Sequence, residues 1–177
     1  MDDFGELPKT RDAELVKKYT RSDQRTMAAW ALDCAERVLP LFQAARPQDD
    51  RPRQALEAGR AWVQTGEFSM ATIRAASLNA HAAAKDTDDS AAIAAAHAAG
   101  QAVATAHVPQ HAYGGAYYAL RAIAAQYPTQ QLEHVNLERE WQAGQLSTHL
   151  RAETMDRIVV EQTPKGLRIT IRKGADF

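Results

Sequence analysis

Two histidines near the middle of the chain have the spacing that most directly suggests chemistry. His107 and His111 stand four positions apart in the segment ATAHVPQHAYGG. On one continuous helix this spacing places two imidazoles on the same face, as in the zinc-binding motif H-E-x-x-H. Here Val108 replaces the glutamate that acts as general base in that motif, and Pro109 predicts that one helix ends and another begins. We therefore expect a helix junction, where the histidines hydrogen-bond backbone groups that lack helical partners.

Other reactive residue types form weaker patterns. His81 and His97 lie on neighbouring predicted helices and can approach one another. Cys34 is the single cysteine, which excludes an internal disulfide, and it stands in the most apolar segment, where a thiol packs as a small hydrophobe. Gly114 and Gly115 lack the lysine of a phosphate-binding loop, so we expect them to let another helix come close. We expect no catalytic residue, no metal site and no cofactor.

Charge and length limit the class of partner. The 177 residues carry 21 Lys and Arg against 22 Asp and Glu, so no overall field attracts nucleic acid or an anionic membrane. The opening MDDFGELPKTRD lacks a signal-peptide pattern, and no apolar run approaches the roughly 20 residues of a membrane span. We expect a cytoplasmic protein that binds a protein partner and neither nucleic acid nor a membrane.

The elements that must position these residues follow a helical period over most of the chain. Half of the residues from 75 to 106 are alanine, which favours two closely packed helices. Pro40 is expected to end or kink the preceding apolar helix near Leu39. Further helices are expected after the N-cap Asp50 with a stop at Gly66, from Ser69 to about Lys85, from near Ser90, from Pro109 to Tyr127, and from Thr129 through Leu150.

The C-terminal segment has a different period. Leu167, Ile169 and Ile171 alternate with polar residues, and TPKG can turn the chain back towards residues 158–160, which predicts a β-hairpin. A lone hairpin is marginal in water, so its apolar face must pack on the helices or its edge must pair with another chain; we favour the first. The predicted fold is all-α, with about six helices in stacked antiparallel hairpins over residues 1–156 and a C-terminal hairpin or tail at 157–177 packed on them.

Several segments resemble a known family. They are WALDCAERVLPLF at 30–42, the alanine-rich pair of helices, ATAHVPQHA at 104–112, and EWQAGQL. From about residue 22 to 151 the chain is similar to small bacterial proteins called putative immunity proteins of polymorphic toxin systems. The resemblance implies an all-helical, non-enzymatic protein that binds and neutralises a cognate toxin.

The polar residues that the resembling segments contain are candidates for a binding or structural cluster. They are Asp33, Glu36, Arg37, His107 and His111. Because they stand beside strongly apolar helices, each needs a partner, and we expect Asp33 or Glu36 to accept a hydrogen bond from one of the two histidines.

Three functions follow from these observations. The first is a non-catalytic immunity protein that occludes a toxin surface. The second is a small metal-dependent or acid/base enzyme that uses His107 and His111 with Asp33 or Glu36. The third is a structural homodimer formed through the C-terminal hairpin.

Overall fold

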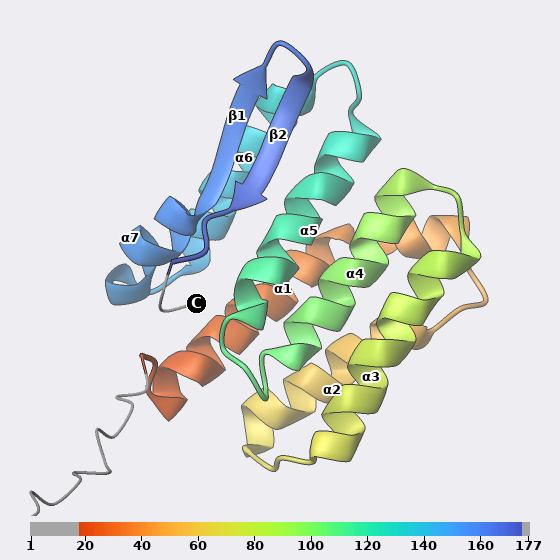
Figure 1. Ribbon diagram of the computed structural model, residues 1–177. Coiled ribbons are helices and arrows are strands. Elements are labelled where there is room, and N and C mark those ends of the chain that lie inside the picture. The colour runs from red at the N-terminus through yellow and green to blue at the C-terminus, as the bar shows by residue number, and fades with distance from the viewer. Residues whose placement is uncertain (1–17, 175–177) are drawn as a thin grey trace, which may run out of the picture.

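The computed structural model describes residues 18–174, in which seven α-helices precede a two-stranded sheet (Figure 1). The helices are α1 (Arg21–Ala45), α2 (Arg51–Thr65), α3 (Met70–Ala83), α4 (Ser90–Ala104), α5 (His111–Gln126), α6 (Gln131–Gln145) and α7 (Thr148–Arg157); a short 3₁₀ turn, η1 (Ala84–Asp86), follows α3, and the strands are β1 (Ile158–Thr163) and β2 (Gly166–Ile171). The predicted fold class is confirmed. Within the described residues, no helix is both long and apolar enough to cross a bilayer. The start of the predicted range 1–156, which contains the opening segment MDDFGELPKTRD, lies outside the described residues. The end of the predicted range 157–177 lies outside them as well.

Helix α1 lies at the centre and packs against α2, α4, α5 and α6 (Figure 1). Its buried positions surround most of the helix and include Trp30 and Cys34, so the predicted burial of the thiol is confirmed. Burial also raises the pKa of Cys34 well above its ordinary value. The thiol therefore serves as part of the core and not as a nucleophile at neutral pH.

Helices α1, α4 and α5 meet at small residues. A Cβ added to Gly115 would lie 3.2 Å from the Cβ of Ala31 and 3.5 Å from the backbone of Ala102. The expected close approach of a helix to this glycine is confirmed. The alanines of α4 allow the approach from the other side, because a short side chain lets two backbones come near each other.

At Pro40 the structure excludes the predicted helix end, and one further predicted helix is wrong in extent. Helix α1 continues through Pro40 to Ala45, and the fully buried Phe42 beyond the proline keeps the last turn packed on the core. The predicted last long helix is divided into α6 and α7, because Leu146 between them is extended (ψ 142°) and buries its side chain. Packing of one apolar side chain at each site outweighs the local preference of the chain, and the break at Leu146 makes seven helices instead of about six.

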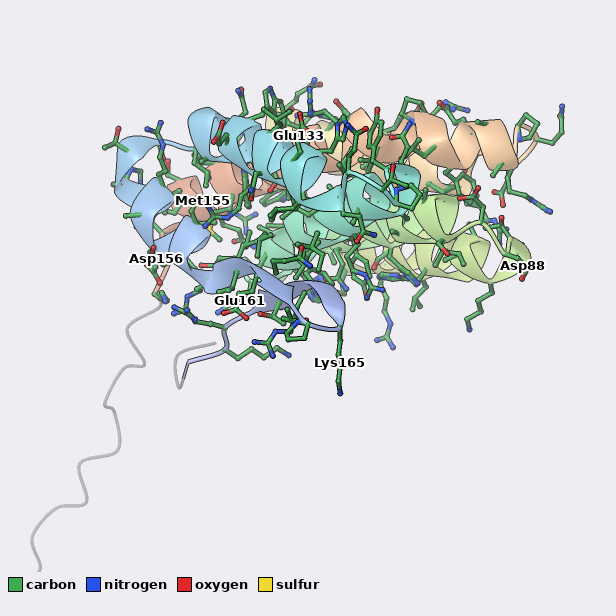
Figure 2. All side chains as sticks on the ribbon, turned by 90° about the horizontal axis from the view of Figure 1, so that it is seen from above. Asp88, Glu133, Met155, Asp156, Glu161 and Lys165 are labelled. Carbon is green, nitrogen blue, oxygen red and sulfur yellow. The ribbon has the colours of Figure 1, made fainter. Side chains whose placement is uncertain are left out.

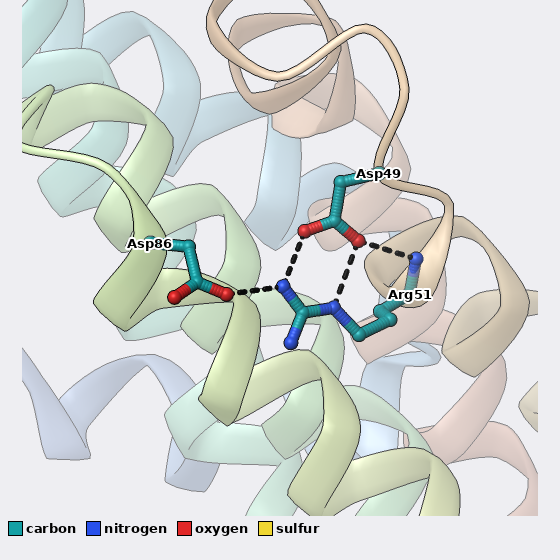
Figure 3. A network of polar contacts seen from close by, with 3 residues as sticks. All are labelled: Asp49, Arg51 and Asp86. Carbon is teal, nitrogen blue, oxygen red and sulfur yellow. Dashed lines mark hydrogen bonds and ion pairs between the residues drawn. The ribbon is translucent and has the colours of Figure 1, made fainter.

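Loops at one end of the bundle are tied together by Arg51. Asp50 is the N-cap of α2 as predicted, but its side chain makes no capping bond. The neighbouring Asp49 instead accepts a hydrogen bond from the backbone N–H of Arg51 (3.1 Å) and another from its guanidinium (2.9 Å). The same guanidinium pairs with Asp86 of η1 (Figure 3). This network joins the α1–α2 loop to the turn between α3 and α4.

The C-terminal hairpin is confirmed, with a register that runs from Ile158 opposite Ile171 to Thr163 opposite Gly166. Its turn residues Pro164 and Lys165 form a two-residue loop. The apolar face of the hairpin packs against the helical core through Val160, Leu167, Ile169 and Ile171, and β2 contacts α5.

Candidate functional site

The structure separates the five candidate residues into three groups on different pairs of elements. Asp33 and Glu36 face α2, Arg37 faces α6, and His107 and His111 lie at the α4–α5 junction. The predicted hydrogen bond from a histidine to Asp33 or Glu36 is wrong. The two carboxylates and the two histidines project from different parts of the bundle, and each carboxylate has a nearer cation.

That cation is Arg60 of α2. Its guanidinium pairs with Asp33 and donates to both oxygens of Glu36 at 2.8 Å. Asp33 and Glu36 are three positions apart and share one face of α1, so a single guanidinium reaches both. The arginine was not among the predicted site residues. A cation facing two carboxylates across a helix pair has no local sequence signal.

Arg37 belongs to a second network that holds α1 against α6. It makes a bidentate pair with Glu138, with N–O distances of 3.0 and 3.1 Å from Nε and 3.0 Å from one terminal nitrogen. The guanidinium also lies over the ring of Trp141, 4.0 Å from its centroid. Glu138 is only 4% exposed, although no sequence motif singled it out. A buried carboxylate of this kind needs its cation, so the pair is a structural tie.

The two histidines of the opening motif do lie at a helix junction. Helix α4 ends at Ala104 and α5 begins at His111, and the two imidazoles are 5.0 Å apart between centroids. His111 Nδ1 is 2.8 Å from the side-chain oxygen of Gln101, and not in a bond to a junction backbone group as predicted. His107 Nδ1 is buried and has no hydrogen-bond partner among the described residues.

Side chains from other elements satisfy the junction instead. Gln24 of α1 donates from Nε2 to the carbonyls of Thr105 (2.8 Å) and Ala106 (3.0 Å). Gly114 leaves the space that Gln101 occupies, because a Cβ there would lie 2.5 Å from the Gln101 oxygen. One glycine of the pair thus admits a helix and the other admits a hydrogen-bonding side chain.

A second histidine pair lies near the first. His81 of α3 and His97 of α4 are 2.7 Å apart between their Nδ1 atoms, which confirms that they approach one another. One of the two nitrogens must carry a hydrogen and donate it to the other. The ring of His97 also lies 5.0 Å from that of Tyr118. A Cβ on Gly100 would lie 2.7 Å from His81, so this glycine makes room for the pair.

Burial favours the neutral form of three of these histidines, His81, His97 and His111. It is the main cause that lowers the pKa of His81 to about 4, with the neighbouring imidazoles as smaller causes, and it lowers the pKa of His97 and His111 as well. The pair His81 and His97 could offer two nitrogens to a metal ion. Within the described residues, no three His, Cys, Asp or Glu side chains gather into a set that could hold one.

The lowered pKa values predict loss of stability in acid. The unfolded chain takes up protons on these imidazoles near pH 6.5, whereas the folded protein resists protonation of His81 down to about pH 4. The free energy of unfolding should therefore fall as the pH drops from 7 to 4, by about 1–3 kcal/mol for the half-buried His81. Urea unfolding at several pH values measures this fall.

The variant His81→Asn isolates the effect, because an amide N–H can still reach His97 but does not titrate. We expect a smaller loss of stability between pH 7 and 4 in this variant. Unfolding at pH 7.5, well above the pKa of His81, reports any damage from the substitution itself. An acid loss of the same size in both proteins would show that His81 is not the responsible group.

A groove runs along β2 on the side of α5. Its larger part has a volume of about 860 Å³ and is lined by Tyr117, Arg121 and Ala124 of α5 and by Lys165, Leu167 and Ile169 of the hairpin. A second part of about 530 Å³ continues past Tyr117 to His111, Ile171 and Lys173. We call these two parts together the β2 groove. Sequence reasoning placed the hairpin on the helices but did not find this groove.

The fold and these sites define a class of protein: an all-helical bundle whose reactive side chains tie helices together and whose hollowed surface lies beside a C-terminal strand. The chain belongs to the Imm-5 like putative immunity protein family, whose model matches residues 17–149. The match ends before the hairpin. No curated protein and no solved structure gives a significant match.

Proposed function

We propose that the protein is a non-catalytic immunity protein that binds a cognate bacterial toxin and neutralises it by covering part of its surface. The observation that carries the proposal is the family match over residues 17–149. Binding of this kind depends on shape and a few buried anchors more than on net charge, in keeping with a chain whose net charge is −1.

The charged residues at the candidate positions form ion pairs between helices, which supports a binding role for the protein. Arg37 holds the buried Glu138, and Arg60 holds Asp33 and Glu36. These charged groups join α1 to α6 and to α2, where each is engaged with a partner of opposite charge. This geometry favours a rigid framework that presents a binding surface, rather than an acid/base centre.

Stoichiometry tests the proposal directly. Where the neighbouring gene encodes a secreted toxin, that toxin would be purified and its activity measured with increasing amounts of the protein. An occluding partner forms a complex of fixed composition, so we expect full inhibition only at one or more copies per toxin and co-elution of the two proteins on size exclusion.

Neutralisation by a small fraction of one equivalent would contradict the proposal and favour an enzyme that acts on the toxin or its product. A variant of an exposed cation that makes no ion pair among the described residues, Arg74→Ala, serves as a control for purification and folding. It should inhibit as the wild type does unless α3 itself contacts the toxin.

A further inference from the structure

The outer edge of β2 is open. The backbone N–H of Arg172 donates to the carbonyl of Arg157 at 2.8 Å, in the same register as the sheet. In an antiparallel pair, residues whose backbone groups bond to the opposite strand alternate with residues whose backbone groups point away from it. On β2 the residues bonded to β1 are therefore Thr170, Arg168 and Gly166. The backbone groups that point away from β1 are those of Leu167, Ile169 and Ile171. None of these three outward-facing residues has a further hydrogen-bond partner among the described residues.

The β2 groove lies along this open edge. Leu167 and Ile169 line its larger part and Ile171 its smaller part, whereas β1 contributes only Thr163, next to the turn. All three apolar side chains pack on the core but keep part of their surface accessible. Tyr117 lines both parts and provides an aromatic surface across from the strand. An added strand would therefore find backbone partners on one side and an apolar wall on the other.

The charges of the groove select the kind of strand. Arg121, Lys165 and Arg168 line its larger part and Lys173 its smaller part, and no carboxylate lines either part. Neither Arg121 nor Lys165 forms an ion pair with a described residue: the Arg121 guanidinium donates to the Tyr117 hydroxyl (3.2 Å), and the Lys165 side chain extends from the hairpin tip (Figure 2). By contrast, Arg168 already pairs with Glu161 of β1. Arg121 and Lys165 are thus available to acidic side chains.

We propose that the outer edge of β2 binds an extended acidic segment of a partner protein, which adds a third strand to the hairpin and lies in the β2 groove. The identification of that partner as a toxin rests on the proposed function. Backbone hydrogen bonds supply the general affinity, and Arg121 and Lys165 select Asp or Glu on the added strand.

The first test uses synthetic peptides and the whole protein. A fluorescent six-residue peptide of alternating valine and glutamate should bind saturably, at least tenfold more tightly than its valine–lysine counterpart, as measured by fluorescence anisotropy. Methylation of alternate backbone nitrogens in the valine–glutamate peptide should weaken binding tenfold or more, because it removes the donors that face β2. Equal binding of the methylated peptide, or no saturable binding of the parent peptide up to 1 mM, would overturn the proposal.

Charge-reversal variants then locate the site. The double variant Arg121→Glu with Lys165→Glu should lose at least tenfold in affinity for the valine–glutamate peptide. The matched control is Arg74→Glu with Lys85→Glu, two exposed cations on and after α3 that lie outside the groove lining, with the same change in net charge. Equal losses in the two double variants, or tighter binding of a single-stranded oligonucleotide than of the peptide, would contradict a site for an acidic strand.

The toxin assay separates the two proposals. If the wild type and the groove variant neutralise the toxin equally, the groove inference fails while the immunity function stands. If the wild type does not inhibit the toxin but binds the acidic peptide at the groove, the immunity function fails while the groove remains a site for acidic strands. Loss of neutralisation in the groove variant, with retention in the control variant, supports both.

Discussion

Replacing Arg37 with alanine is expected to lower the free energy of unfolding by about 2–4 kcal/mol. The substitution leaves the carboxylate of Glu138, which is 4% exposed, without the guanidinium that makes three hydrogen bonds to it. A buried charge without its partner is costly, because it has left water without gaining an opposite charge. The Arg37 side chain is itself 44% exposed, so we expect a value below the largest known losses. Urea unfolding at pH 7 measures the change.

Two controls decide whether the buried carboxylate is the cause. The double variant Arg37→Met with Glu138→Met removes both charges and should recover most of the lost stability. Arg53→Ala breaks the exposed pairs with Asp50 and Glu57 and should change stability by less than about 1 kcal/mol. If the double variant is no more stable than Arg37→Ala, the loss comes from the packing of Arg37 on Trp141 instead.

The second large effect is expected at Gly115, where Gly115→Leu should cost about 3 kcal/mol or more. The Cβ of the new residue would already lie 3.2 Å from Ala31, and its branches would press on α1 and α4, whose contacting atoms belong to backbone or to Cβ. These elements cannot move without disturbing the centre of the core. A loss of this size is a large fraction of the stability of an ordinary domain. Thermal and urea unfolding report it, and failure to fold is the extreme form of the same outcome.

Gly144 is the matched control for this substitution. It also lies within a helix, α6, but a Cβ there meets no atom within 4 Å. Because leucine is a better helix former than glycine, Gly144→Leu should raise the free energy of unfolding by about 0.5–1 kcal/mol. A loss of stability in Gly144→Leu as large as that in Gly115→Leu would show that crowding between helices is not the reason for the loss.

Much of the fold could be predicted because its signals are local. Ser69 caps α3 through a bond to the N–H of Thr72, and Gly66 ends α2 with a φ of 73° that suits glycine. The alternation of apolar and polar residues in the C-terminal segment predicted the hairpin. Predictions failed where a distant contact opposed the local preference: burial of Phe42 carries α1 past Pro40, and burial of Leu146 divides the last helix.

The candidate site was harder to predict than the helices that carry it. Arg37, His107 and His111 all take part in polar or ring contacts. Their partners were not recognised. The nearest signal was the segment EWQAGQL, which contains Trp141 beneath Arg37, but the buried Glu138 precedes it and has no motif of its own.

By itself, the sequence determined the class of fold, the cap at Ser69, the helix end at Gly66, the hairpin and the family, since all of these depend on neighbours along the chain or on motifs within it. The tertiary structure decided the polar pairs and the open edge of β2. Arg37 and Glu138 are 101 positions apart, and a hydrogen bond forms only when its two atoms meet within about 3 Å and in the right direction. That condition depends on how the helices pack. The packing of helices is not specified by a residue and its neighbours along the chain.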